Sequence, residues 1–380
     1  MQMTQSDIST NILFKILSAV VNDTRRDAGC VDGEQVGSQS SCLSSCLSSL
    51  RSLTPQDWQG IYELSKAQGV TAVVFEKVKC WAKEVDLPKD LALRWLSSLI
   101  SVERQQRMKL AACESFAEKL SEHGLKTLVL KGVAVSKYYP VPSQREFGDL
   151  DCFLYETGTD GSISFAGCYE KGNLILEKSG SRVEREHYKH SHIHYKALEV
   201  ENHQFCLPIR GSKSNKELER HLRSLLNAEF AARSESDYLL LDTHLYCPPA
   251  DFNALFLTAH ALNHFLFESI KVRHLLDWAL FLKAEHKNIN WDSFWAWCDK
   301  MHYKRFVLCL NHICKTELGL QIDIPQPVEE GFEVEEISKK ILGDVFNGDS
   351  LYSKNIGKWQ MRRLLVESMY DFKMEIPRFV

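Results

Sequence analysis

Two short apolar segments, separated by a Lys-Gly turn, constrain the fold of this chain more than any other part of it. The first, residues 125–130, predicts a buried strand that ends at Lys131 and Gly132. Residues 133–139 have the apolar spacing of one or two helical turns, and two prolines then break this pattern. The second segment, residues 147–155, predicts another strand.

This second strand carries two aspartates at alternate positions. Residues two apart in a strand point to the same face, so we expect Asp149 and Asp151 to project together while Leu150 and Cys152 enter a core. Two neighbouring carboxylates repel unless a cation lies between them, and their oxygen atoms suit Mg²⁺ or Mn²⁺ better than zinc. Taken alone, such a pair is more often part of a solvated edge strand, where charge prevents edge-to-edge pairing.

The order of these elements resembles the DNA polymerase beta-like nucleotidyltransferase superfamily. The narrower resemblance is to a branch of uncharacterised bacterial nucleotidyltransferases that carries Leu-Lys-Gly followed by Arg-x-x-Gly-Asp-x-Asp. In this sequence the motifs are Leu130-Lys131-Gly132 and Arg145-Glu146-Phe147-Gly148-Asp149-Leu150-Asp151. The resemblance extends from about residue 111 to residue 318, and it implies that Asp149 and Asp151 bind divalent metal ions.

Transfer of a nucleotide with two metal ions needs a third carboxylate, because two cations carry more charge than two aspartates offset. A strand at residues 198–203 would place Glu199, Glu201 and His203 on one face. The branch resembled carries an acidic-x-His pattern here, which matches Glu201-Asn202-His203 and implies Glu201 as the third ligand. Glu199 is the alternative. Without the resemblance, these residues also fit the polar face of a half-exposed antiparallel strand.

The Lys-Gly turn is the candidate nucleotide-binding element. Backbone N–H groups at Gly132 could approach phosphates because no Cβ intervenes, and Lys131 or Arg145 could neutralise phosphate charge. The next residue, Val133, replaces the Ser or Gly that is common in the superfamily, and so removes a hydroxyl contact. Because Lys131 precedes its glycine, this turn is not a Walker A loop.

Two histidines four residues apart, His260 and His264, lie in a segment with helical spacing. This is the geometry of a zinc pair, but position 261 is Ala where the metalloprotease signature needs Glu. A hydrogen-bonded pair facing the core is an alternative. The branch resembled has His-x-x-x-His followed by Arg and Asp, which implies that His260, His264, Arg273 and Asp277 line the cleft, together with His203. Arg273 and Asp277 also have the i, i+4 spacing of a structural ion pair.

Composition excludes several classes of protein. The chain has 46 Lys and Arg against 50 Asp and Glu, a net charge of −4, so nucleic acid is not favoured as a partner. No secretion signal or membrane span is predicted, and the 12 scattered cysteines include no Cys-x-x-Cys pair. We therefore expect a cytoplasmic protein with free thiols.

Together these features predict an α+β fold in which a small mixed sheet carries the site. We expect an N-terminal helical region (residues 1–120), a nucleotidyltransferase-like core (121–246) and a C-terminal helical domain (247–380). Further predicted elements are a helix capped by Thr54, one long helix or two in line over 89–123, a helix within 163–171, extended segments at 173–177 and 191–205, and a solvated His- and Lys-rich run at 184–196.

The resemblance implies a metal-dependent nucleotidyltransferase. It would move a nucleoside monophosphate from an NTP to an acceptor hydroxyl on a small molecule or a protein side chain, with Mg²⁺ or Mn²⁺ as cofactor. The alternative is a catalytically inactive nucleotide-binding or interaction protein on the same scaffold. A zinc hydrolase that uses His260 and His264 is a third hypothesis.

Overall fold

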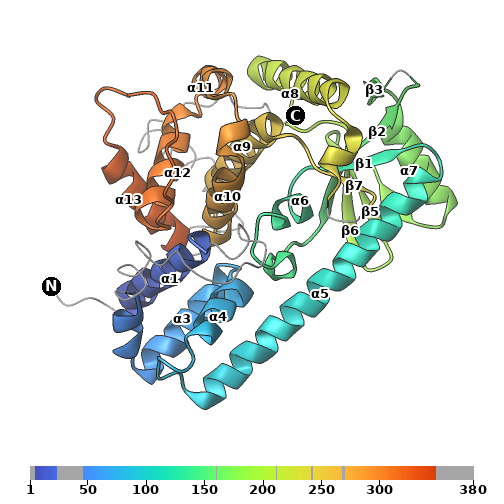
Figure 1. The fold of residues 1–380 in the computed structure, drawn as a ribbon. Coiled ribbons are helices and arrows are strands. Elements are labelled where there is room, and N and C mark those ends of the chain that lie inside the picture. Colours follow the sequence, from blue (N-terminus) through green and yellow to red (C-terminus); the bar gives the residue numbers. More distant parts are fainter. Residues whose placement is uncertain are drawn as a thin grey trace.

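The fold is α+β, as predicted: one mixed sheet lies among helices that come from both ends of the chain (Figure 1). The computed structural model describes residues 5–23, 46–159, 161–210, 212–240, 243–267 and 270–347. The sheet strands are β1 (Lys126–Val129), β2 (Leu150–Thr157), β3 (Ile163–Ser164), β4 (Arg182–Glu184), β5 (His190–Tyr195), β6 (Leu198–His203) and β7 (Leu245–Tyr246).

Strand β2 occupies the middle of the sheet, whose order is β4-β5-β6-β2-β1-β7 with β3 paired to β2. It runs antiparallel to β1 and parallel to β6. The register of the β2–β6 pair places Asp151 opposite Glu201. Side chains that are 50 residues apart in sequence therefore start from adjacent backbone positions.

The N-terminal helices are α1 (Gln5–Val21), α3 (Pro55–Ala67), α4 (Thr71–Cys80) and α5 (Lys89–Ser121). Thr54 caps α3 as predicted: its side chain accepts from the backbone of Asp57, and the Asp57 carboxylate accepts in return from the backbone N–H of Thr54. The predicted helical segment 89–123 is one continuous helix, α5. It runs from the N-terminal helices to the sheet (Figure 1).

One further group of helices lies around the sheet, and another forms the C-terminal part. Those near the sheet are α6 (Val133–Ser136), η1 (Pro142–Gln144), α7 (Cys168–Lys178), α8 (Lys213–Ala232) and η2 (Glu235–Tyr238). The C-terminal ones are α9 (Ala250–Phe267), α10 (Val272–Glu285), η3 (His286–Asn288), α11 (Trp291–Lys300), α12 (Lys304–Thr316) and α13 (Val334–Asn347).

Both faces of β2 are buried, which explains why its sequence is almost continuously apolar. Leu150, Cys152 and Leu154 belong to a core formed with the C-terminal half of α5 and with α7. Phe153 and Tyr155 point to the opposite face and join the larger apolar core. Asp151 lies on this second face, since it alternates with Leu150 and Cys152.

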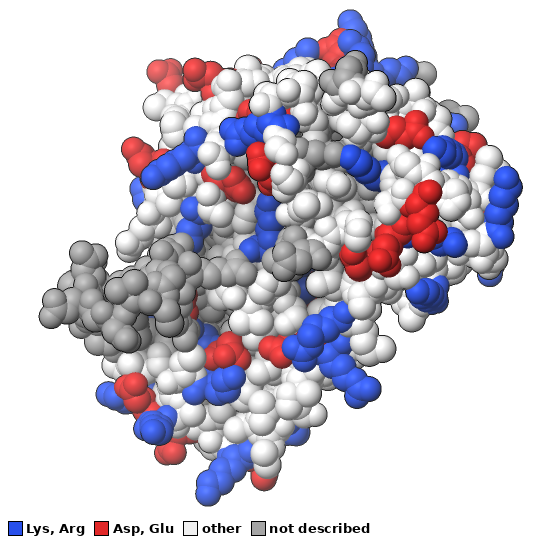
Figure 2. Space-filling model, turned by 45° about the vertical axis from the view of Figure 1, so that its right-hand side comes forward, with Lys and Arg blue, Asp and Glu red and all other residues white. Residues whose placement is uncertain are grey.

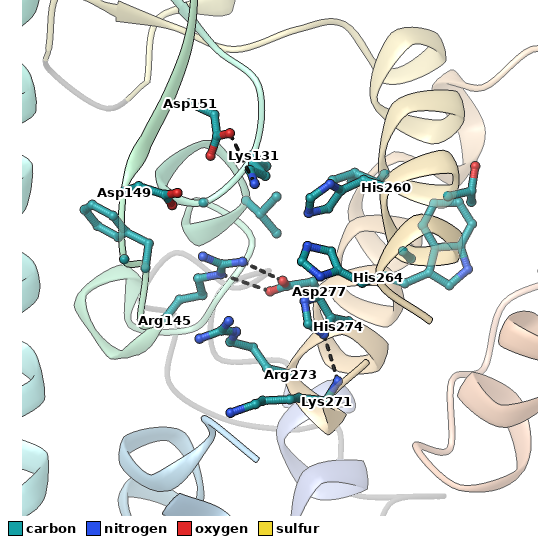
Figure 3. Close-up of a pocket in the computed structure, with 18 of the residues that line it drawn as sticks. Lys131, Arg145, Asp149, Asp151, His260, His264, Lys271, Arg273, His274 and Asp277 are labelled. Carbon is teal, nitrogen blue, oxygen red and sulfur yellow. Dashed lines mark hydrogen bonds and ion pairs between the residues drawn. The ribbon is translucent and has the colours of Figure 1, made fainter. Parts of the chain in front are cut away.

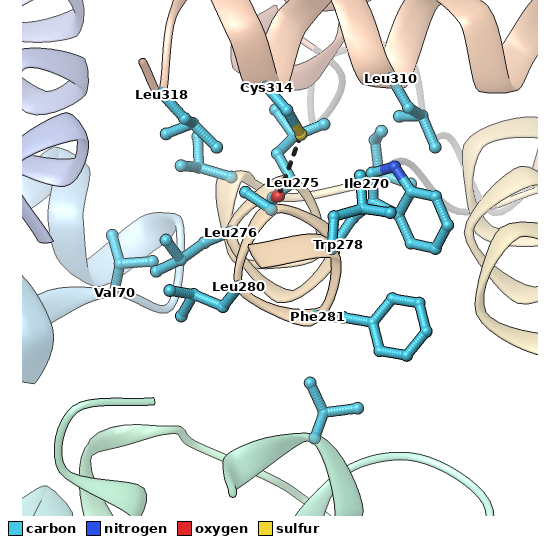
Figure 4. Packing of buried hydrophobic residues seen from close by; sticks show 14 of the residues in the cluster. Val70, Ile270, Leu275, Leu276, Trp278, Leu280, Phe281, Leu310, Cys314 and Leu318 are labelled. Atoms are coloured by element: carbon cyan, nitrogen blue, oxygen red, sulfur yellow. Dashed lines mark hydrogen bonds between the residues drawn. The ribbon is translucent and has the colours of Figure 1, made fainter. Parts of the chain in front are cut away.

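Helix α10 lies at the centre of the larger core, where its apolar side chains pack against α12 and the N-terminal helices (Figure 4). The Cys314 thiol donates to the Leu275 carbonyl at 3.6 Å, which ties α12 to α10. Leu17 of α1 and Leu276 of α10 belong to the same cluster of buried residues. The N- and C-terminal helices thus share one core, and the domain boundaries at residues 120 and 246 stay a prediction.

Two predicted elements after β2 are wrong. Residues 173–177 are not extended but belong to α7, which also starts later than the predicted helix at 163–171. Asn173 fixes this helix under the sheet, because its side-chain oxygen accepts from Ser191 and from Asn202. The run 184–196 is solvated only in part: Arg185, Glu186 and His187 are exposed, but all of β5 lies within the run and buries Ser191 and Ile193.

Among the described residues, no helix combines the length and apolar character that crossing a membrane requires.

On the face drawn in Figure 2, described Lys and Arg residues alternate with Asp and Glu, as the nearly balanced composition predicts. This mixed distribution is unlike the continuous basic stripe of a nucleic-acid-binding surface.

Candidate active site

The structure brings together the three carboxylates that the sequence singled out. Asp149 immediately precedes β2, Asp151 is the second residue of β2, and Glu201 lies opposite Asp151 on β6. Each offers an oxygen atom, and these atoms all lie within 4.8 Å of one another. The arrangement follows from period-two alternation in a strand and from the parallel pairing of β2 with β6. Their role as metal ligands stays a prediction.

Asp151 is the most buried of the three, with 2% of its surface exposed. Its Oδ1 atom lies 3.1 Å from Lys131 Nζ and 3.1 Å from His203 Nε2. Burial alone would raise the pKa of Asp151, but Lys131 and His203 outweigh it and hold that pKa below its usual value. The Oδ2 atom is buried and finds no hydrogen-bond partner among the described residues.

The other two carboxylates respond differently to this crowding. Burial and the nearby Asp151 raise the pKa of Asp149. Burial also opposes ionisation of Glu201, but its hydrogen bond with His203 outweighs this effect and lowers the pKa of Glu201. Three carboxylates so close together in a largely buried place favour the approach of a cation.

Lys131 supplies part of the compensating charge. It follows β1, where the Leu130 N–H donates to the Asp151 carbonyl at 3.0 Å, and this places the lysine beside the carboxylates. Burial would lower the pKa of Lys131, but Asp151 and the other two carboxylates raise it above the usual value. Gly132 has φ +58°, a conformation that disfavours any residue with a side chain.

Arg145 pairs with Asp277 across the site. The guanidinium donates from Nη2 to Oδ2 at 2.7 Å and from Nε to Oδ1 at 3.2 Å, and the Tyr139 hydroxyl adds a bond to Oδ1 at 2.7 Å. The direct ion pair of Asp277 is therefore with Arg145 and not with Arg273, the i, i+4 alternative, although the charge of Arg273 also helps to lower the pKa of Asp277. Arg273 instead donates to the Glu146 carbonyl at 3.1 Å. Asp277 faces the loop before β2, so the nearest cation comes from that loop.

A cavity of about 390 Å³ lies between the carboxylates and helices α9 and α10 (Figure 3). Asp149, Asp151 and Lys131 line one side of it, and His260 and His264 of α9 face them from the other. The remaining lining residues include Gly132, Arg145, Lys271, Arg273, His274 and Asp277. The expected cleft-lining residues of α9 and α10 are thus at the cavity, whereas Glu201 and His203 lie behind Asp151 on β6.

Among the described residues, no third metal ligand completes a zinc site with His260 and His264 of α9. Burial and the Lys131 ammonium lower the pKa of His260 well below its usual value, so this side chain is neutral. Within the described part of the chain, two groups of three or more side chains are close enough to hold an ion, and neither includes His260 or His264. These histidines are cavity walls, and a zinc hydrolase is not supported.

Sequence reasoning missed the histidines of β5. His190 and His192 point toward Glu201, with Nδ1 to carboxylate distances of 3.5 Å and 4.0 Å. Burial lowers the pKa of His190 to about 3. The available signal was the alternation in residues 190–195, where every second residue is His and the residues between them are buried.

A comparison with protein-family models decides the family. The model described as "Uncharacterised nucleotidyltransferase" matches residues 54–319 of this 380-residue chain. The chain belongs to this nucleotidyltransferase family. The matched range begins at the N-cap of α3 and includes all three carboxylates, Lys131, Gly132 and the residues that line the cavity of this nucleotidyltransferase. Neither the curated proteins nor the solved structures compared with the chain gave a match.

Proposed function

We propose that this nucleotidyltransferase moves a nucleoside monophosphate from an NTP to an acceptor hydroxyl, with Mg²⁺ or Mn²⁺ as cofactor. The acceptor would be a small molecule or a protein side chain, and the core at residues 121–246 would be of the polymerase beta-like type. The observation that supports this most is the convergence of Asp149, Asp151 and Glu201 within 4.8 Å, next to the Lys131-Gly132 turn and a cavity.

The residues present fit a hard divalent ion. The three carboxylates offer only oxygen atoms, which Mg²⁺ and Mn²⁺ prefer. The buried Oδ2 atom of Asp151, which lacks a hydrogen-bond partner among the described residues, is a ligand position that an ion would satisfy. When bound, such an ion offsets phosphate charge and lowers the pKa of the acceptor hydroxyl.

In the proposed transfer the acceptor oxygen attacks the α-phosphorus. A new P–O bond forms, the bond from that phosphorus to the oxygen that leads to the β-phosphate breaks, and pyrophosphate leaves. Glu201 has a lowered pKa and is ionised near neutral pH, so it can receive the hydroxyl proton. Lys131 and the N–H groups near Gly132 would contact the triphosphate, and Arg145, which lines the same cavity, would add positive charge to its wall.

The same scaffold could instead bind a nucleotide without catalysis. The position of Glu201 argues for the enzyme, because a protein that only binds nucleotides has no need of a third carboxylate beside the first two. Lys131 alone, 3.1 Å from Asp151, would not neutralise the group. The site therefore favours catalysis.

The test is transfer of label from each α-labelled NTP in the presence of Mg²⁺ or Mn²⁺, with fractionated small molecules and proteins as acceptors. Asp151→Asn and Glu201→Gln should reduce transfer at least about 100-fold. The matched control is Glu199→Gln, because Glu199 lies on the same face of β6 but is exposed and binds His194 at 2.8 Å. Transfer that survives the first two substitutions, or that depends on Glu199 instead, would refute the proposed site.

A further inference from the structure

A second group of metal-ligating side chains lies behind the carboxylates and shares Glu201 with them. It consists of His190 of β5 with Glu201 and His203 of β6, whose ligand atoms lie within 4.8 Å of one another. His190 and His203 are register partners across the β5–β6 pair. The group is therefore built on paired strands and its geometry is fixed by the sheet.

The distances within this group suit a small ion with nitrogen ligands. His190 Nδ1 lies 3.5 Å from Glu201 Oε2, and His203 Nε2 lies 3.3 Å from the same oxygen. Ligand atoms about 2.0–2.1 Å from a tetrahedral zinc ion are about 3.4 Å apart. Both distances to Glu201 thus match the separation that such an ion imposes, and the two histidines lie within 4.8 Å of each other.

The hydrogen bonds of His203 fix which of its nitrogens faces this position. Its Nδ1 lies 3.1 Å from the Phe205 carbonyl, which can only accept, so Nδ1 carries the hydrogen. Its other ring nitrogen, Nε2, then faces Asp151 Oδ1 at 3.1 Å and Glu201 Oε2 at 3.3 Å. The ring of His203 is thus held with Nε2 directed at the carboxylate oxygens beside which an ion would lie.

His190 presents its other nitrogen to the same position. Its Nε2 lies 3.2 Å from His192 Nε2, which leaves Nδ1 turned toward Glu201. That Nδ1 atom is buried and makes no hydrogen bond to any described residue. The side chains of His203, His190 and Glu201 are 1%, 12% and 20% exposed, so the position is enclosed by its ligands yet reachable through Glu201.

We propose that His190, Glu201 and His203 form a binding site for a divalent transition-metal ion such as Zn²⁺. Two imidazoles and one carboxylate select zinc and its neighbours, whereas Mg²⁺ prefers the all-oxygen group of Asp149, Asp151 and Glu201. The Nδ1 hydrogen bond of His203 orients the ring as it does in known metal sites. The transition-metal site shares Glu201 with the proposed transfer site but does not depend on transfer.

The experiment is Co²⁺ titration of untagged, EDTA-treated protein without nucleotide, followed by visible absorption. We expect about one Co²⁺ ion to bind per chain, with visible absorption bands typical of Co²⁺ bound by nitrogen ligands. Added Zn²⁺ should abolish these bands by displacing Co²⁺, whereas excess Mg²⁺ should not. His190→Gln should weaken Co²⁺ binding at least about tenfold. The matched control is His194→Gln, since His194 lies on the same face of β5 but contacts Glu199 instead. Unchanged binding in His190→Gln would overturn the proposal.

A second measurement needs no substitution. X-ray absorption of the zinc-loaded, unmutated chain should show two imidazole ligands, and a spectrum with only oxygen ligands would overturn the proposal. Label transfer with Mg²⁺ is measured separately on the same samples. Co²⁺ binding without any label transfer would support the transition-metal site and reject the proposed enzyme. Label transfer without Co²⁺ binding at His190 would support the enzyme and reject the transition-metal site.

Discussion

The buried ion pair between Arg145 and Asp277 connects the loop before β2 to helix α10, and its removal should destabilise the protein strongly. Only 8% and 10% of the two side chains are exposed. Asp277 accepts two bonds from the Arg145 guanidinium, at 2.7 and 3.2 Å, and one from the Tyr139 hydroxyl at 2.7 Å. Every bond of this carboxylate to those two residues is charge-assisted and shielded from water.

Asp277→Asn leaves the Arg145 cation buried without a counterion, which should lower the free energy of unfolding by about 3–5 kcal/mol. Tyr139→Phe removes a single hydrogen bond to a charged group and should cost about 1.5–3 kcal/mol. Replacing both charges by apolar side chains of similar size removes the desolvation penalty as well. The double variant Arg145→Met/Asp277→Leu should therefore be more stable than Asp277→Asn by at least about 1 kcal/mol.

Urea denaturation followed by tryptophan fluorescence measures these differences, since the chain has eight tryptophans. The control is Arg51→Gln. Arg51 also pairs with a carboxylate, Glu84, but their side chains are 59% and 44% exposed, so the change should stay within about 0.5 kcal/mol. A cost below about 1 kcal/mol for Asp277→Asn, or a double variant that is no more stable than Asp277→Asn, would refute this reasoning.

The pH dependence of the same pair has a defined sign. Burial would raise the pKa of Asp277, but Arg145 outweighs it, and the folded-state pKa lies below the usual value. The stabilisation is therefore complete above the unfolded-state pKa of about 3.9 and is lost as pH falls through the lower folded-state pKa. The stability difference between the unmutated chain and Asp277→Asn should be constant from about pH 5 to about pH 8 and should shrink below about pH 4.

Three further substitutions test other parts of the structure. Lys131→Met should tighten Mn²⁺ binding about tenfold without nucleotide, because the ammonium 3.1 Å from Asp151 competes with the ion; calorimetry showing unchanged or weaker binding would contradict this. Thr54→Ala should lower the free energy of unfolding by about 1 kcal/mol through loss of the α3 cap, and an unchanged urea midpoint would argue against the cap. Gly132→Ala should cost about 1–3 kcal/mol because of its φ of +58°, whereas Gly148→Ala, with open space around it, should be nearly neutral.

Local rules account for the parts of the fold that the sequence predicted. The capping box at Thr54, the continuous helix α5 and the alternation along β2 depend on residues a few positions apart. The same alternation places Glu199 and Glu201 on one face of β6 but does not choose between them. That choice came from the acidic-x-His resemblance, and the register that sets Glu201 opposite Asp151 is visible only in the folded sheet.

The parts that were missed depend on contacts distant in sequence. Residues 173–177 have the apolar content of a strand, yet they form helix because Asn173 bonds to Ser191 and Asn202 beneath the sheet. Arg145 and Asp277 are 132 positions apart, so helical spacing suggested Arg273 as the partner instead. The role of His190 became apparent only when β5 paired with β6.

The burial of Asp151 indicates that this position in the sheet serves function at a cost in the free energy of folding. Along β2, Phe153 and Tyr155 follow Asp151 on the same face and belong to the apolar core. An apolar side chain at position 151 could be buried there without the free-energy cost of removing a charge from water. Instead the strand buries a carboxylate with only 2% exposure and one oxygen lacking a hydrogen bond to the described residues. A stable fold alone does not call for such a group, because Lys131 and His203 offset only part of its cost. Perturbed carboxylates gathered beside a cavity are what a site that binds cations and phosphates requires.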